Sequence, residues 1–99
     1  MVRHIYFFRL KDPAAWKSVA AKLLTLKDHI PEILSMEVGR DFRGAENSYD
    51  LCQMITFRSM EDFLTFSRNE YHAGIRQEMA QLQRESAKID YEIPDGANP

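Results

Sequence analysis

The chain has 99 residues, a formal net charge of −2 and 44% hydrophobic residues, a balance typical of one small globular domain. This composition excludes a disordered or low-complexity chain, and the acidic balance gives no general attraction to nucleic acid or to an anionic membrane. The single cysteine excludes an internal disulfide and a thiolate metal centre. Because the sequence shows neither a long apolar run nor a signal-peptide pattern, we expect a cytoplasmic protein.

The N-terminal third predicts a strand followed by a helix. Residues 2–10 are rich in β-branched and aromatic side chains, which favours a strand. Its two faces are His4, Tyr6 and Phe8 on one side and Ile5 and Phe7 on the other. Asp12 as the N-cap and Pro13 as the first helical residue then predict a helix that ends at residues 29–31.

The rest of the chain repeats this order after an extra strand. Residues 33–42 and 49–58 alternate as two strands joined by a turn. A capping-box-like segment at 59–62 opens a helix, and after Asn69 a second helical pattern continues on His72, Ile75, Met79, Leu82 and Ser86. Residues 87–93 alternate again, and 94–99 form a tail. The order βαββαβ predicts one α+β domain over residues 1–93, a ferredoxin-like four-stranded antiparallel sheet with helices on one face.

The strands are apolar on both faces, which predicts a partner for the sheet. Ile5 and Phe7 oppose Tyr6 and Phe8 in the first strand, and the strand at 49–58 is similarly double-sided. An exposed patch of this size is rare in soluble monomers. We therefore expect a homodimer that packs the two sheets face to face and closes a barrel-like core.

Two other classes of function have weaker support. RNA-recognition domains share this topology, but residues 49–54 lack the glycine and the aromatic pair that such domains use to stack bases, so we expect no nucleic-acid partner. His4, His29 and His72 fall on three different elements with no i, i+4 pair, so their spacing predicts no metal site. His29 is explained by its place in the last turn of a helix, where a partly positive ring is favoured.

Several polar side chains are instead expected to point inward, between the sheet and the helices. They are His4, Gln53, His72 and Asp90. Buried polar groups of this kind form either a satisfied hydrogen-bond network or the lining of a cavity, and the sequence leaves both open. The residues expected to line a small-molecule pocket are Tyr6, Phe8, Gln53, Phe66, Ile75 and Met79.

Six segments, taken together, resemble the stress-responsive α/β-barrel (Dabb) family. They are Val2–Asp12, Ile30–Arg40, Ser48–Cys52, Phe57–Glu61, Tyr71–Gly74 and Ile89–Glu92. The resemblance spans residues 2–93 and implies a dimeric ferredoxin-like barrel. The best-defined enzymes of the family resemble plant polyketide cyclases, which fold a linear poly-β-keto chain by aldol chemistry without metal or cofactor.

The resemblance also implies roles for individual residues. The catalytic histidine of the cyclases falls on His72, their N-terminal cavity histidine on His4 and their late-strand aspartate on Asp90. Their substrate-orienting tyrosine falls on Phe66, which has no hydroxyl, and Tyr71 is the candidate to supply a phenol from another place.

Three hypotheses follow. The first is a cofactor-free acid/base enzyme or binder for a small hydrophobic or keto ligand, with His72 as general base and His4, Asp90 and Tyr71 as its polar partners. The second is a non-catalytic dimeric or oligomeric stress module, in which the same residues form an internal network. The third is a cofactor-free small monooxygenase of the same dimeric barrel fold.

Overall fold

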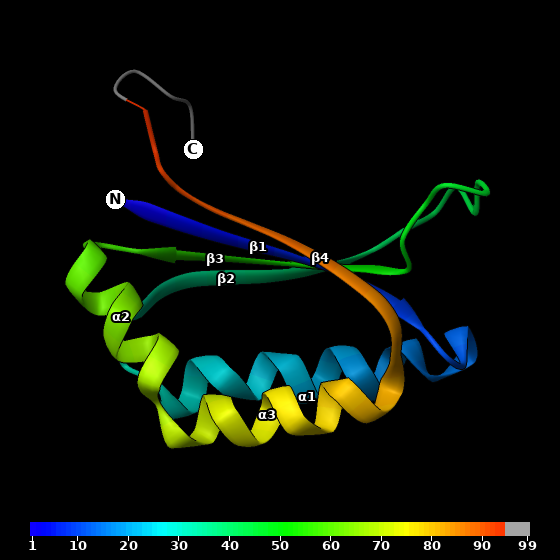
Figure 1. The fold of residues 1–99 in the computed structure, drawn as a ribbon, viewed down its shortest axis with the longest axis horizontal. Helices are drawn as coiled ribbons and strands as arrows, with labels where there is room; N and C mark the ends of the chain where they lie inside the picture. Colours follow the sequence, from blue (N-terminus) through cyan, green and yellow to red (C-terminus); the bar gives the residue numbers. More distant parts are fainter. Residues whose placement is uncertain (95–99) are drawn as a thin grey trace.

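A computed structural model describes residues 1–94 and shows a four-stranded sheet with its helices on one face (Figure 1). The elements are β1 (Val2–Leu10), the 3-10 turn η1 (Pro13–Ala15), α1 (Trp16–His29), β2 (Ile33–Arg40), β3 (Leu51–Phe57), α2 (Met60–Arg68), α3 (Glu70–Leu82) and β4 (Gln83–Glu92). The strands lie in the order β2-β3-β1-β4, and every neighbouring pair is antiparallel. The predicted ferredoxin-like α+β fold is confirmed.

The helix predicted from Pro13 opens with the 3-10 turn η1, and α1 itself begins at Trp16 without a side-chain cap. The Asp12 carboxylate accepts a hydrogen bond from the Ala14 N–H, and Ser59 Oγ accepts one from the Asp62 N–H at 3.1 Å. Asn69 ends α2 and begins α3, and its side-chain oxygen accepts from the His72 N–H at 3.1 Å. This cap turns the chain between the two helices and fixes His72 in the first turn of α3.

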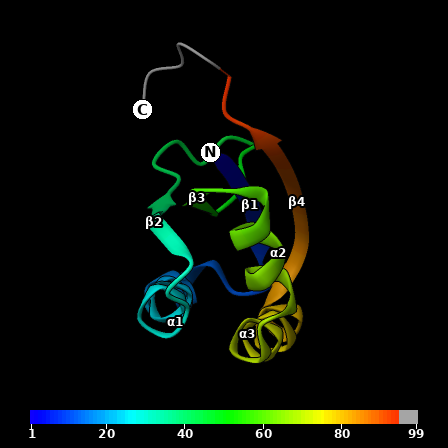
Figure 2. The same cartoon turned by 90° about the vertical axis from the view of Figure 1, so that its left-hand side faces the viewer.

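Strand register brings residues from distant parts of the chain together on the inner face. His4 of β1 lies between Ile55 of β3 and Asp90 of β4, and Tyr6 is flanked by Gln53 and Lys88. The core lies between this face and the helices, with α1 and α3 side by side beneath the sheet (Figures 1 and 2). Its fully buried large side chains are Phe57, Phe66, Leu23, Leu26, Ile30, Leu51, Ile55 and Val19.

The predicted boundary between the last helix and the last strand is wrong. The helix ends at Leu82, and β4 begins at Gln83 instead of residue 87, so Ser86 lies in the strand and not on the helical stripe. The cause is tertiary: residues 83–86 pair with the end of β1, where Ser86 lies opposite Phe8. Backbone pairing along an edge strand outweighs the helical spacing of a few side chains.

The outer face of the sheet has an apolar centre, as the pattern of the first strand predicts, with the Arg9–Glu85 ion pair beside it. Ile5 and Phe7 of β1 lie between Met54 and Cys52 of β3 and the outer side chains of β4. Ile89, next to Ile5 on this face, is 54% exposed.

No helix within residues 1–94 is long and apolar enough to cross a membrane. Of the predicted tail, residues 95–99 lie outside the described part of the chain.

Candidate functional site

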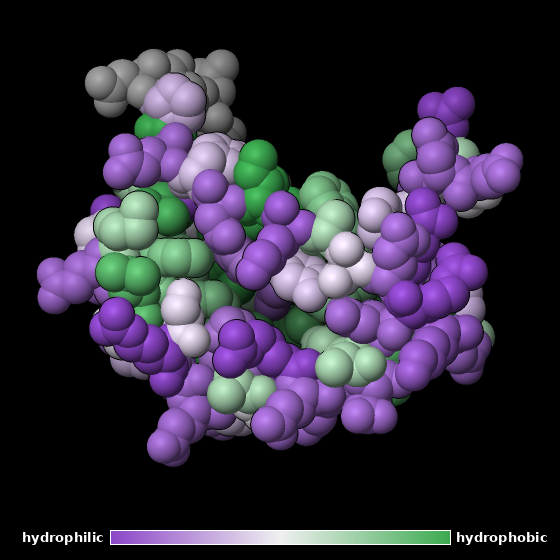
Figure 3. All heavy atoms as spheres, in the orientation of Figure 1, coloured by the Kyte–Doolittle hydropathy of each residue, from purple (hydrophilic) through white to green (hydrophobic). Residues whose placement is uncertain are grey.

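A cavity of about 310 Å³ lies between the inner face of the sheet and the helices. In the space-filling view it opens as a hollow between β4 and α3, with apolar surface inside and hydrophilic surface around it (Figure 3). Its walls come from β1, β3, β4 and all three helices, and the lining includes His4, Tyr6, Phe8, Gln53, Phe63, Phe66, Ser67, His72, Ile75, Arg76, Met79, Lys88 and Asp90. The sheet and the helices therefore enclose a space as well as a packed core.

His4 and Asp90 form a hydrogen-bonded pair on the sheet wall of this cavity. The two residues are direct cross-strand neighbours, and the Asp90 carboxylate accepts a hydrogen bond from His4 Nδ1. His4 is buried with 8% exposure, whereas the Asp90 side chain is about one-third exposed. Because a carboxylate can only accept, Nδ1 carries a proton, and Nε2 is the ring nitrogen left for a ligand.

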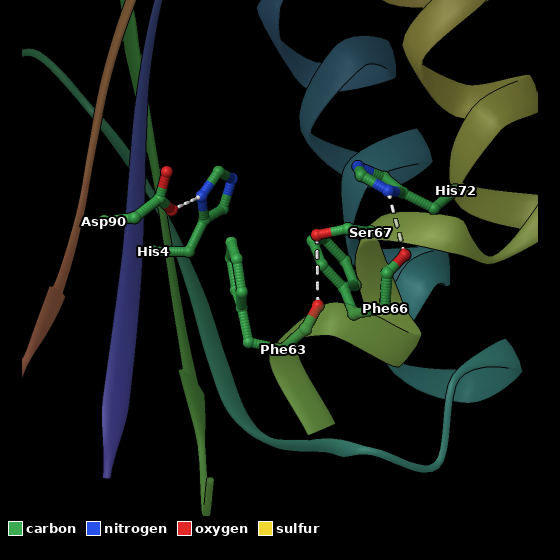
Figure 4. Close-up of polar contacts among 6 residues, drawn as sticks. All are labelled: His4, Phe63, Phe66, Ser67, His72 and Asp90. Atoms are coloured by element: carbon green, nitrogen blue, oxygen red, sulfur yellow. Dashed lines mark hydrogen bonds and ion pairs between the residues drawn. The ribbon is translucent and has the colours of Figure 1, made fainter. Parts of the chain in front are cut away.

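His72 lies on the helix wall, and its tautomer is fixed in the same way. Its Nδ1 lies 3.1 Å from the backbone carbonyl oxygen of Phe66, at the end of α2. A carbonyl oxygen cannot donate, so Nδ1 donates and Nε2 of the neutral ring keeps a free lone pair. In the close-up this second nitrogen points toward the side of the cavity where His4 lies (Figure 4).

The aromatic ring of Phe66 connects the two histidines. It stacks on His72 with centroids 4.0 Å apart and lies 5.8 Å from the His4 ring. Phe63 completes this aromatic group at 6.2 Å from His4. Ser67 also lines the cavity, and its hydroxyl donates to the Phe63 carbonyl oxygen at 3.1 Å (Figure 4). Imidazoles therefore face a largely apolar space from opposite walls.

The surroundings of His72 favour its neutral form. Burial is the largest cause, and the nearby Arg76 guanidinium is the second; together they lower the pKa of His72 from 6.5 to about 4. The hydrogen bond to Phe66 opposes this shift, while His4 and Lys88 add to it. At pH 7 the ring is neutral, with its one proton on Nδ1, and it can accept a proton or a hydrogen bond at Nε2.

The structure brings nearly all of the sequence-predicted residues to one place. The cavity is lined by His4, His72, Asp90, Tyr6, Phe8, Gln53, Phe66, Ile75 and Met79. Tyr71 is the exception: its hydroxyl hydrogen-bonds Thr25 Oγ1 at 2.6 Å, and its ring stacks on His29 at 3.8 Å. It faces α1 because it precedes His72 by one residue, which turns it about 100° around the helix.

Four polar residues of the lining were not predicted from the sequence: Ser67, Arg76, Gln83 and Lys88. Two of them carried a signal in their spacing. Arg76 follows His72 by one helical turn, and Lys88 precedes Asp90 by two residues on the same strand face. Within residues 1–94, no group of three or more His, Cys, Asp or Glu side chains is placed to hold a metal ion.

The protein is thus a ferredoxin-like domain with a pocket between its sheet and its helices, lined by both polar and apolar side chains. The sequence identifies its family. Residues 2–93 match the stress responsive A/B barrel domain (Dabb) family. The match covers almost the whole chain, so this protein belongs to the Dabb family.

Solved structures with the same fold include proteins of different kinds. A dimeric ferredoxin-like protein of unknown function from Thermobifida fusca is 22% identical, with a TM-score of 0.80 over 93% of this chain and 90% of that chain. A hydroxynitrile lyase from Passiflora edulis is 22% identical, with a TM-score of 0.84 over 98% and 96%. HapK from Hahella chejuensis is 17% identical, with a TM-score of 0.79 over 100% and 98%. No curated protein sequence matches the chain.

Proposed function

We propose that this Dabb-family protein uses its cavity for acid/base chemistry on a small hydrophobic keto compound, with His72 as the general base. The observation that carries the proposal is a neutral His72 whose free Nε2 faces a cavity that also contains the His4–Asp90 pair. Proton removal next to a carbonyl needs a base on one side of the substrate and a group that stabilises the developing oxyanion on the other.

His72 suits the first role. Its Nε2 takes the proton from the carbon next to the ketone, and the electron pair of that C–H bond moves into the enolate. A pKa of about 4 makes His72 a weak base. Such a base suffices for this chemistry, because ketosteroid isomerase removes a proton α to a ketone with a carboxylate of pKa about 4.6.

His4 suits the second role. In the doubly protonated form of His4 both ring nitrogens are donors: Nδ1 to the carboxylate and Nε2 to a ligand in the cavity. Nε2–H would then donate to the oxygen of the enolate, while the Asp90 charge stabilises the imidazolium. The hydroxynitrile lyase of the same fold shows that this architecture accommodates an enzyme in another protein.

The cavity fits a compact apolar substrate. Its volume of about 310 Å³ is at the lower end of ligand pockets, which span roughly 300–1,000 Å³. Phe66 occupies the place where the resemblance to the cyclases implies a tyrosine, so the substrate here is oriented without that hydroxyl. Tyr71 faces α1 and has no part in this proposal.

We also propose that two copies of the chain pack through their outer sheet faces. Ile5, Phe7 and Ile89 form an apolar surface on that face, and it continues onto β3 through Cys52 and Met54. Burial and the charge of Glu37 raise the pKa of the Cys52 thiol, so it stays protonated and suits an apolar seam. The dimeric ferredoxin-like neighbours support a homodimer, and the choice of this face rests on its apolar side chains.

Deuterium exchange tests the chemistry without knowledge of the natural substrate. Transfer of α-protons from 2-decanone to D₂O can be followed by NMR with and without the protein. We expect protein-dependent exchange that falls about 100-fold or more in His72→Gln and that also falls in Asp90→Asn. His29→Gln is the matched control, because His29 lies outside the cavity lining and should leave the rate unchanged.

The outcomes separate the hypotheses. Equal exchange in His72→Gln and the parent protein would refute the role of His72. Absence of exchange with 2-decanone bound in the cavity would favour the non-catalytic module. With His72 as the base, the rate should fall as the pH drops through about 4, the direction set by its lowered pKa.

A further inference from the structure

Two cationic side chains of the cavity have no part in the chemistry proposed above. Arg76 lies on α3 one turn after His72, and Lys88 lies on the inner side of β4, opposite Tyr6 of β1. Both line the cavity, and both are near enough to His72 to lower its pKa. They approach the same space from its helix wall and from its sheet wall.

Neither cation is neutralised by a neighbour. Within residues 1–94 the ion pairs are His4–Asp90, Arg9–Glu85 and Lys22–Glu78, so Arg76 and Lys88 have no carboxylate within 4 Å. Asp90 is the one acidic side chain of the described cavity lining, and it is engaged with His4. The lining therefore carries two cations against one carboxylate, in a chain whose net charge is −2.

Much of the interior behind these charges is apolar. Phe8, Leu23, Leu26, Ile75 and Met79 form much of its wall. Both cations line the cavity and are also exposed, which places them where the cavity meets solvent. An apolar interior with a cationic rim is complementary to a molecule with an apolar chain and one anionic end.

We propose that the ligand of this cavity is an anionic amphiphile, with its apolar chain among the core side chains and its carboxylate or phosphate group between Arg76 and Lys88. The inference deepens the proposed function, because it names the substrate class of the same site. Arg76 suits planar, bidentate recognition of such a group, and Lys88 adds a second charge from the opposite wall.

Binding of such an anion would also act on His72. Both cations contribute to the low pKa of His72, after burial. A bound anion offsets their charge, so the pKa of His72 should rise on binding and its basicity should increase. A neutral ligand of the same length lacks this effect.

Binding measurements test the inference independently of any turnover. Calorimetric titration compares decanoate, decyl phosphate and 1-decanol, which share one chain length. We expect at least one of the two anions to bind about tenfold more tightly than 1-decanol, and the tighter of the two identifies the headgroup. Arg76→Gln and Lys88→Gln should each weaken that anion about fivefold or more and leave 1-decanol nearly unchanged.

Arg84→Gln is the matched control, because it removes the same charge from β4 outside the cavity lining and should leave anion binding unchanged. Circular dichroism and thermal melting show that each variant is folded. Equal affinity for anions and alcohol, anion binding insensitive to both substitutions, or no anion binding would each overturn the inference. Tight anion binding without proton exchange next to the ketone of an anionic keto probe, 9-oxodecanoate, would refute the proposed chemistry alone.

Discussion

The two faces of β1 are built from alternate residues of one nine-residue strand and have opposite character. On the inner face, His4 has a partner in Asp90 and Tyr6 has one in Ser86, so polar groups are satisfied around a cavity. On the outer face, Ile5 and Phe7 have apolar neighbours within the sheet, and no layer of residues 1–94 covers them, since the helices lie on the other side (Figure 1). One strand thus supplies the polar lining of a pocket and an apolar surface for assembly.

A charge substituted on the outer face should disrupt dimerisation and leave the fold of the chain intact. We expect Ile5→Asp to raise the dimer dissociation constant at least about 100-fold, because a two-fold interface contains the substitution twice and buries an unpaired carboxylate each time. Sedimentation velocity with circular dichroism measures assembly and folding together.

Leu24→Asp is the control for this experiment, since it places the same charge on a half-exposed position of α1. A dimer of unchanged stability in Ile5→Asp, or a parent protein that is monomeric at micromolar concentration, would refute assembly through this face.

Truncation of a core side chain on the inner face should leave a new void and lower the stability of the fold. Phe57 is fully buried and packs against Phe63 and Phe66, with ring centroids 5.7 and 5.0 Å away. We expect Phe57→Ala to lower the free energy of unfolding by about 3–5 kcal/mol in urea denaturation. Leu24→Ala, on the exposed side of α1, should cost less than about 1 kcal/mol, and a similar loss in both variants would contradict this view of the core.

The buried imidazole should make stability depend on pH. The folded chain holds the pKa of His72 near 4, against 6.5 for an unperturbed ring, so between these values the unfolded chain binds the proton more readily. Stability should therefore fall as the pH drops from 7 to 4. The full shift corresponds to about 3 kcal/mol, and the partial exposure of the ring reduces the expected loss to about 1–2 kcal/mol.

His72→Phe isolates this contribution, because it keeps an aromatic ring against Phe66 and cannot be protonated. Urea denaturation at pH 7 and pH 4.5, at one protein concentration, should show a smaller loss of stability in the variant. An equal loss in both proteins would mean that His72 titrates alike in the folded and unfolded chain.

The smallest effect is expected from the single hydrogen bond of Tyr6. Its hydroxyl donates to Ser86 Oγ at 3.0 Å across the β1–β4 pair. Tyr6→Phe should lower the free energy of unfolding by about 1 kcal/mol and leave the dimer unchanged, because the ring stays on the inner face. A change of assembly in this variant would show that the two faces are coupled.

Alternation along the strands was enough to predict the fold and both faces of β1. Successive side chains of a strand point to opposite faces, so placing one residue on a face assigns all the others. The boundary between α3 and β4 could not be predicted in this way, because it is set by the pairing of β4 with β1. The end of α3 at Leu82 depends on hydrogen bonds to β1, which no local pattern contains.

The polar residues of the cavity were only partly predictable. His4, His72 and Asp90 stood out because histidines and carboxylates are conspicuous on an inward face. Arg76 and Lys88 share a helix or strand face with His72 and Asp90, but this spacing is equally typical of solvated charges, and the cavity between α3 and β4 is what makes them part of the site. Tyr71 was misplaced because its neighbour His72 points to the cavity, so Tyr71 itself must point elsewhere on the helix.

The most direct test of the account is the protonation state of His72 in solution. Long-range ¹H–¹⁵N NMR spectra of the folded protein report which ring nitrogen carries the proton, and their pH dependence gives the pKa. We expect the Nδ1–H tautomer, held by the Phe66 carbonyl, and a pKa near 4. An Nε2–H tautomer, or a pKa close to 6.5, would contradict a neutral base that faces the cavity.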